Sequence, residues 1–228
     1  MAKSRQRLQA IALRKQGKSI KNIARILGAA QSSVSVWCRD ISLSKEQRDA
    51  LVRNGADGLK LGQLIAAELK RKKRMDVVAD FQKQGLAYFN KLTQKEFFTF
   101  GLALYLCEGA KTDRRFVFTN SDPALIRVLV KWLHAFYGID NNRLGFRVQI
   151  HEMHKPREKL IQNFWRKYLN LSSPVIITVN YIKTARQKVY ENYDSYYGTM
   201  HLRVLKGTHF FYRIQGLIDG IISKLNQA

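Results

Sequence analysis

The stretch FFTFGLALYLCEGAKTD, Phe97 to Asp113, decides the fold of the larger part of this 228-residue chain. A helix over these residues places Thr99, Ala103 and Cys107 four residues apart on one side. Small side chains at that spacing allow another helix to approach closely. The other sides carry large apolar residues, namely Phe100, Leu102, Leu104 and Leu106. The segment therefore predicts a helix that packs, through its small-residue face, against another helix.

The helix ends at Glu108 and Gly109. A carboxylate beside the last carbonyls of a helix is unfavourable, because the C-terminal end of the helix dipole is already negative. A divalent cation held by Glu108 and the backbone carbonyl of Cys107 reverses that interaction, and oxygen ligands suit Mg²⁺ or Mn²⁺. The alternative is that Glu108 is solvated or paired with Lys111 and that Gly109 only stops the helix. The segment alone leaves both interpretations open.

Residues 101–109 resemble a LAGLIDADG motif. Ala103 and Cys107 stand at the two small interface positions of that motif, and Glu108 stands at its metal-binding acid. The segment departs from the motif at two other positions, where Gly101 replaces the first leucine and Leu106 the first aspartate. The resemblance implies that two motif helices pack at a dyad and that their terminal acids bind the metal ions that hydrolyse both strands of DNA.

One copy of the motif implies a homodimer, because a symmetric two-metal site needs two copies. The segment IQGLIDGII, Ile214 to Ile222, reads like a second copy, but it has Ile221 at the metal-binding position. Too few residues follow it to form a sheet, so we expect a packing helix there. For the developing charge of a hydrolysis reaction, the sequence offers Lys183 or Lys188 and does not choose between them.

The residues after the motif alternate between strand and helix patterns. Residues 115–120 place Arg115 and Thr119 on one face of a strand, opposite two phenylalanines, and residues 144–151 alternate fully. The outward side chains of this second strand are hydrogen-bonding groups that suit DNA: Arg147, Gln149 and His151. Further strands are expected at 175–183 and 200–205, and helices at 123–133, 157–169 and 211–225. We predict an α+β fold, with a LAGLIDADG-like mixed α/β domain over 93–228 and a DNA-facing antiparallel sheet.

The N-terminal residues 1–44 have the pattern of a helix-turn-helix. Apolar residues recur at helical spacing in two segments that end at Gly17 and Gly28, and a third helix is expected over 31–39. In the third helix Val34, Trp37 and Cys38 face the core, which leaves groove-compatible side chains outside: Gln31, Ser32, Ser35 and Arg39. The segment resembles the resolvase-type helix-turn-helix that precedes a LAGLIDADG-like domain in a group of bacterial and phage-type proteins. An ordinary three-helix bundle for protein contacts is the alternative.

Residues 45–92 read as a helical connector. The segment is rich in Lys, Ala, Leu and Gln and contains no proline, but glycines interrupt it at 55, 58, 62 and 85. We therefore expect broken helices rather than one rod.

The charge of the chain points to a polyanionic partner. Lys and Arg outnumber Asp and Glu 40 to 17, which gives a net charge of +23. Residues 1–95 hold 21 basic and 7 acidic residues, and the rest of the chain holds 19 and 10. Because both parts are basic, we expect both to contact double-stranded DNA. No apolar run approaches the ~18 residues of a membrane span, and the N-terminus lacks a signal segment. We expect a cytoplasmic, nucleoid-associated protein with no membrane partner and no small-molecule substrate.

Other site chemistry is weakly supported. Cys38 and Cys107 are too few for a zinc site or a disulfide framework, and we expect both to be buried and reduced. His151 and His154 are three residues apart, whereas a zinc-protease helix places its histidines four apart. No Walker loop, dinucleotide fingerprint or nucleophile elbow is present in the sequence.

Two functions are consistent with these patterns. The first is a homing-type endonuclease, in which Glu108 from two chains positions metal ions in a DNA-bound homodimer. The second is a non-catalytic transcription regulator that keeps the LAGLIDADG-like domain as a binding and dimerisation scaffold. A protein–protein adaptor explains the charge on both domains poorly.

Overall fold

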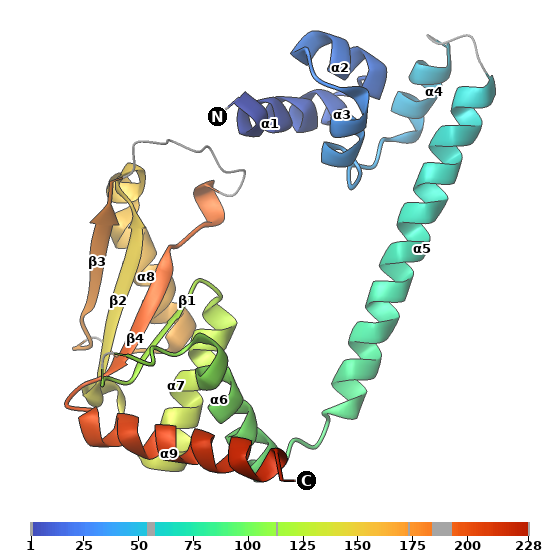
Figure 1. Ribbon diagram of the computed structural model, residues 1–228. Helices are drawn as coiled ribbons and strands as arrows, with labels where there is room; N and C mark the ends of the chain where they lie inside the picture. The colour runs from blue at the N-terminus through green and yellow to red at the C-terminus, as the bar shows by residue number, and fades with distance from the viewer. Residues whose placement is uncertain (1, 54–57, 113, 173, 184–192, 228) are drawn as a thin grey trace. The chain divides into compact units, whose positions relative to one another are not determined.

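The computed structural model describes residues 2–53, 58–112, 114–172, 174–183 and 193–227 (Figure 1). They form two compact units, an N-terminal one built on Met1–Lys91 and a C-terminal one built on Leu92–Ala185 with Asp194–Ala228. Each unit has its own buried apolar cluster, so each is described by itself.

The N-terminal unit begins with three helices, α1 (Ala2–Lys15), α2 (Ile20–Leu27) and α3 (Gln31–Trp37). Ser19 caps α2 by accepting a hydrogen bond from the Asn22 amide, and Gly28 ends it in the left-handed conformation at φ 57°. The three helices bury one small core, formed by Ala10, Ile23, Val34 and Cys38. The predicted helix-turn-helix, with its turn at Gly28, is confirmed.

Two further helices complete this unit, α4 (Lys45–Arg53) and α5 (Gly58–Tyr88). The amide of Gln47 on α4 donates to the Lys15 carbonyl at the end of α1, 2.9 Å away, which fixes α4 against the first helix. The described connector residues thus form two helices rather than one, and Gly58 is the first residue of the second. Helix α5 runs for 31 residues through Gly62 and Gly85, so the expectation that these two glycines interrupt the connector is wrong. Gly55 lies outside the described residues. A helical glycine costs only about 1 kcal/mol relative to alanine, and the good helix formers around it outweigh that cost.

The C-terminal unit contains a four-stranded sheet in the order β1-β4-β2-β3. Its strands are β1 (Val117–Asn120), β2 (Leu144–His151), β3 (Ile177–Ile182) and β4 (Thr199–Val204). Strand β4 is antiparallel to both of its neighbours, but β2 and β3 are parallel. The prediction of an antiparallel sheet is therefore wrong for β3. Helix α8 (Glu158–Leu169) joins β2 to β3 as a crossover, and such a connection returns the chain in the same direction.

The sheet has one buried face and one open face. Helices α6 (Gln94–Glu108), α7 (Pro123–Tyr137) and α8 contact its strands, and α9 (Thr208–Leu225) packs against α6. Alternate residues of each strand point into this helical layer. In β2 these are the buried residues Leu144, Phe146, Val148 and Ile150. The intervening residues lie on the other face and are half-buried or exposed. The sequence therefore builds a sheet that buries one side and leaves the other open.

Candidate nucleic-acid interface

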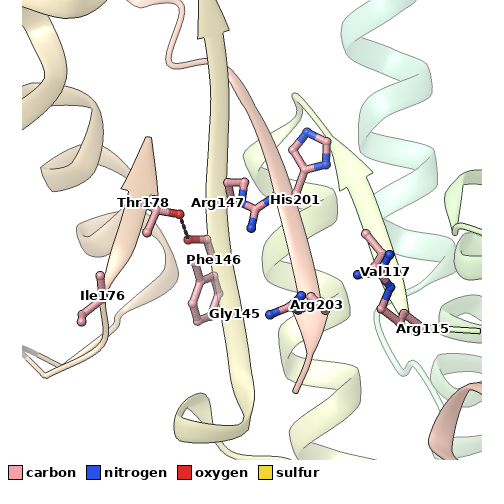
Figure 2. A pocket seen from close by; sticks show the side chains of 9 residues that line it. All are labelled: Arg115, Val117, Gly145, Phe146, Arg147, Ile176, Thr178, His201 and Arg203. Carbon is pink, nitrogen blue, oxygen red and sulfur yellow. Dashed lines mark hydrogen bonds between the residues drawn. The ribbon is translucent and has the colours of Figure 1, made fainter. Parts of the chain in front are cut away.

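The open face of the sheet carries a hollow surrounded by cations. Arg115, two residues before β1, Arg147 on β2 and Arg203 on β4 line a hollow of about 370 Å³. Figure 2 shows their side chains. None of the described residues that line it is acidic. Guanidinium groups present several N–H donors in a planar fork that matches the geometry of phosphate oxygens. The hollow is therefore suited to an anionic group.

Sequence patterns indicated only part of this surface. Arg115, Thr119, Arg147 and Gln149 were predicted, and the structure brings them to one face. Sequence reasoning missed the three other residues with polar side chains that line the hollow, namely His201 and Arg203 on β4 and Thr178 on β3. The signal was available, since TMHLRV in β4 alternates as fully as β2 and buries Met200, Leu202 and Val204. Applying the same alternation rule to β4 identifies its outward residues.

A row of hydrogen bonds crosses three strands of the open face. Thr119 on β1 is paired in register with His201 on β4, and His201 with Arg147 on β2. The Nδ1 atom of His201 lies 3.0 Å from the Thr119 hydroxyl, and its Nε2 atom lies 2.8 Å from Oε1 of Gln149. Burial lowers the pKa of His201, and the positive charge of Arg147 lowers it further. The imidazole is therefore held neutral between its two partners.

His151 lies at the end of the same outward row of β2 but is turned toward its own chain. Its Nδ1 atom accepts a hydrogen bond from the Met153 amide at 3.2 Å. The next histidine along, His154, is buried, and burial followed by the charge of Arg157 lowers its pKa. The described residues contain no group of three or more His, Cys, Asp or Glu side chains placed to hold a metal ion.

Glu108 is the last residue of α6 and is exposed to solvent. The Gly109 amide makes the last hydrogen bond of the helix, to the Tyr105 carbonyl, and the Ala110 amide then donates to the Val117 carbonyl, each at 2.8 Å. The Tyr105 hydroxyl donates to the Ala110 carbonyl at 2.9 Å, and burial raises the pKa of Tyr105 to about 12. The segment after α6 is therefore anchored, and the last carbonyls of the helix, near Cys107, have no donors within the helix itself.

The stripe of small residues on α6 is exposed. Thr99, Ala103 and Cys107 all face solvent in the described residues, and Phe100 beside them is 51% exposed. The expectation that Cys107 is buried is therefore wrong, because it lies on this outer side and not on the core side of α6. Phe100 also lies outside the core, whereas Leu102 is buried in it.

Close packing against Trp132 explains the glycine at position 101, where the sequence departs from the motif. A Cβ atom at this position would lie 2.2 Å from Cδ1 of Trp132. Trp132 on α7 is fully buried, and its Nε1 atom donates to the Phe98 carbonyl at 2.9 Å. The tryptophan thus occupies the space that a side chain at 101 would need, so α6 and α7 approach closely through glycine.

Of the two lysines proposed for catalysis, the structure describes only Lys183. Lys183 follows β3, its side chain is 84% exposed, and its Nζ atom lies 3.8 Å from a carboxylate oxygen of Glu152. A pair that exposed contributes little to stability. Lys188 lies outside the described residues.

On the N-terminal unit, α3 presents the predicted outward face. Gln31, Ser32, Ser35 and Arg39 are all exposed, while Val34 and Cys38 are buried behind them. Burial raises the pKa of the Cys38 thiol, so that it stays protonated. Helix α3 therefore offers an amide and two hydroxyls. It ends at Trp37, two residues earlier than the expected 31–39, so the cation of Arg39 lies just beyond it.

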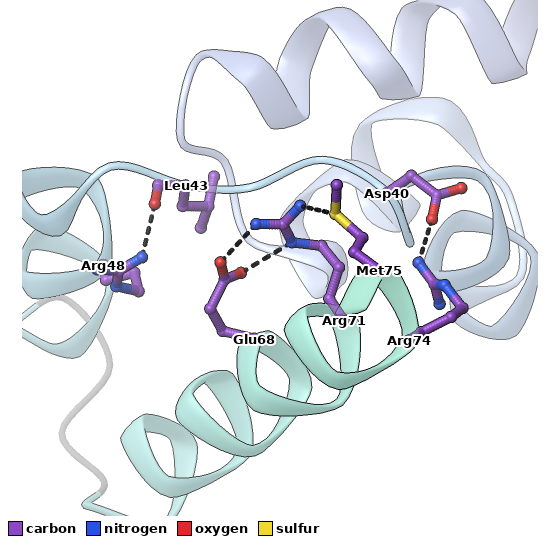
Figure 3. A network of polar contacts seen from close by, with 7 residues as sticks. All are labelled: Asp40, Leu43, Arg48, Glu68, Arg71, Arg74 and Met75. Carbon is purple, nitrogen blue, oxygen red and sulfur yellow. Dashed lines mark hydrogen bonds and ion pairs between the residues drawn. The ribbon is translucent and has the colours of Figure 1, made fainter. Parts of the chain in front are cut away.

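A network of ion pairs and hydrogen bonds ties α5 to the segment after α3 (Figure 3). Arg74 on α5 pairs with Asp40 at 2.5 Å, and Arg71 pairs with Glu68 at 2.7 Å. The hydrogen bond from Arg71 lowers the pKa of Glu68. Two cations of the basic run Lys70–Arg74 are thus engaged within the protein, and its three lysines remain on exposed helix surface.

Comparison with known protein families finds one match, which lies in the N-terminal part of the chain. Residues 1–60 match the family model of a Homeodomain-like domain. The N-terminal unit contains a homeodomain-like helix-turn-helix. Domains of the helix-turn-helix type suggest DNA binding, and double-stranded DNA as the partner. No curated protein and no solved structure matches the chain. Among the described residues, none of the helices has the length and apolar character needed to cross a bilayer.

Proposed function

We propose that this protein is a sequence-specific binder of double-stranded DNA that uses two surfaces, helix α3 and the open face of the sheet. The observation that carries the proposal is the exposed polar face of α3 within a homeodomain-like helix-turn-helix. In such domains the recognition helix enters the major groove, and amide, hydroxyl and guanidinium groups bond with base edges there.

The open face of the sheet supports the second contact. Three arginines surround its hollow, and the major groove is wide enough to admit strands as well as a helix. Phosphate contacts supply most of the affinity of such surfaces, whereas side chains aimed at base edges supply the specificity. Arg115, Arg147 and Arg203 fit the first role, and Gln149 fits the second.

The test is selection from a random duplex library by the full-length protein, followed by titration of the enriched duplex. Replacing Gln31 and Ser35 by alanine should reduce discrimination between the selected and a scrambled duplex, because both side chains face the groove. Replacing Lys159 and Lys224, which are exposed on α8 and α9, provides the control. Binding that does not discriminate between the two duplexes in the wild-type protein would contradict sequence-specific recognition.

The second candidate is Mg²⁺- or Mn²⁺-dependent cleavage of DNA by a homodimer. Two observations favour it: the exposed stripe of Thr99, Ala103 and Cys107, and the exposed Glu108 at the end of the same helix. If two copies of α6 pack along this stripe, both Glu108 carboxylates come to one dyad. Together with the carbonyl of Cys107 and the DNA phosphates they would form an oxygen-rich site of the kind that Mg²⁺ prefers.

Glu108→Gln separates the nuclease from a non-catalytic regulator. The change keeps the shape of the side chain and removes its charge, so cleavage of the selected duplex should fall by orders of magnitude. Binding should survive, and the melting temperature should stay level or rise, because a negative group leaves a helix C-terminus. Asp219→Asn on the exposed side of α9 is the matched control. A wild-type protein that binds its site but never cuts it with Mg²⁺ or Mn²⁺ would refute the nuclease and leave the regulator.

A further inference from the structure

We propose that Gln149 recognises a guanine rather than an adenine, because His201 orients its amide so that only N–H donors face the partner. This inference rests on the proposed function, since it requires the open face of the sheet to lie against base edges. Gln149 would select guanine, and His201 would act as a positioning residue that sets this specificity.

The orientation follows from the hydrogen-bond chemistry of the row Thr119, His201 and Gln149. The atom of Gln149 that faces Nε2 of His201, at 2.8 Å, is the carbonyl oxygen Oε1. An amide oxygen only accepts, so Nε2 carries the proton and donates it. The ring is neutral, so Nδ1 bears a lone pair and accepts from the Thr119 hydroxyl, 3.0 Å away. With Oε1 of Gln149 facing the ring, both contacts are satisfied by one tautomer of His201, the one protonated on Nε2.

This orientation leaves Gln149 with hydrogen-bond donors, and no acceptor, for a ligand. A glutamine with both ends of its amide available pairs with adenine, accepting from N6 and donating to N7. Here Oε1 is directed along the sheet toward β4, and the NH₂ group is left with its two donors. Guanine presents two acceptors, N7 and O6, on the same edge of the major groove. Gln149 in this orientation therefore matches guanine and lacks the acceptor that adenine requires.

Arg147, which lies beside Gln149, also offers only hydrogen-bond donors. Arg147 is two residues before Gln149 on the same face of β2 and is exposed. A guanidinium group only donates hydrogen bonds, and the commonest specific contact of arginine is with guanine. The two outward side chains of β2 that lie beside His201 thus form a surface of donors.

The experiment is library selection with the full-length protein, read position by position. The wild type should enrich guanine at one position that depends on Gln149, and Gln149→Ala should abolish the preference there while leaving the other positions unchanged. His201→Phe keeps a planar ring but removes the donor that holds Oε1. It should move the preference at that position from guanine toward adenine by roughly 10-fold or more, the discrimination typical of one bidentate pair.

His209→Phe is the matched control, because His209 is an exposed histidine on α9, in the helical layer. It should leave every preference as in the wild type. If His201→Phe does not give the cooperative melting transition of a folded protein, His201→Val replaces it, since a β-branched residue suits a strand. A shift toward adenine is not expected from a merely structural loss of His201, which would weaken all positions together.

Three results would overturn the inference. One is a wild-type protein that selects adenine at the Gln149-dependent position, and another is a Gln149→Ala variant with unchanged preferences. The third is a folded His201 variant that gains no preference for adenine there. In all three the selected duplexes still bind, so the proposed function survives. A wild-type protein that enriches no duplex removes the proposed function, and this inference falls with it.

Discussion

Removing the cations of the sheet hollow tests, through salt dependence, whether the open face contacts phosphates. Arg147 and Arg203 both line the hollow, where no acidic side chain accompanies them among the described lining residues. Each phosphate neutralised by a protein cation adds about 0.9 to the slope of log K against log salt concentration. If each arginine contacts one phosphate, Arg147→Ala with Arg203→Ala lowers the slope by about 1.8. Over a fourfold rise in salt, the wild type then loses about 12-fold more affinity than the variant.

The assay is a fluorescence anisotropy titration of one duplex at several salt concentrations, with both proteins at the same pH. A variant that removes two exposed lysines of the helical layer, Lys159→Ala with Lys224→Ala, has the same net charge as the double arginine variant. It should keep the wild-type slope, because those lysines lie on α8 and α9. Equal slopes for the arginine variant and the wild type would refute the reasoning, even if the arginine variant bound more weakly at every salt concentration.

Three further predictions concern packing, pH and assembly. Gly101→Ala should lower the free energy of unfolding by about 1–3 kcal/mol in denaturant titrations, because the new Cβ would lie 2.2 Å from a Trp132 atom; unchanged stability would contradict the close packing. The lowered pKa of buried His154 means that the unfolded chain binds protons more readily, so the melting temperature should fall as the pH drops through about 6.5. His154→Phe should make that fall smaller without abolishing it, because the pKa of His201 is lowered as well, and an unaltered profile would count against the role of His154. Ala103→Phe should give monomers by light scattering if the exposed stripe of α6 forms the dimer, and an unchanged dimer mass would place the interface elsewhere.

Element positions were predictable because each depended on local patterns. Strand β2 occupies Leu144–His151 as the alternation predicted, and α7 begins at Pro123, where Asp122 caps the helix by accepting from the Ala124 amide at 2.8 Å. Alternation reports which side of a strand is buried, but it carries no information about which strand lies beside it. The parallel pairing of β2 with β3 was therefore beyond the sequence pattern.

For the candidate site, the sequence predicted which side chains of one strand or helix point outward, but not the contacts between strands. The outward positions of α3 and of β2 follow from periodicity, and they lie outward in the structure. The hydrogen-bonded row of Thr119, His201 and Gln149 joins residues up to 82 positions apart in the chain. It depends on the order of the strands, so no local pattern could reveal that His201 controls the amide of Gln149.

Because Glu108 is exposed at the end of α6, the proposed DNA cleavage would depend on formation of the dimer. One exposed carboxylate and a backbone carbonyl are a poor Mg²⁺ site, because protein sites for this ion usually combine carboxylates with substrate phosphates and water. Among the described residues of a single chain, no group of three or more His, Cys, Asp or Glu side chains is placed to hold a metal ion. A metal site at Glu108, as proposed, would take its further ligands from DNA and from a second chain, and the exposed stripe on α6 is the surface proposed to bind that chain. Cleavage, if it occurs, should therefore require the dimer, whereas binding by the helix-turn-helix needs only the monomer's own α3.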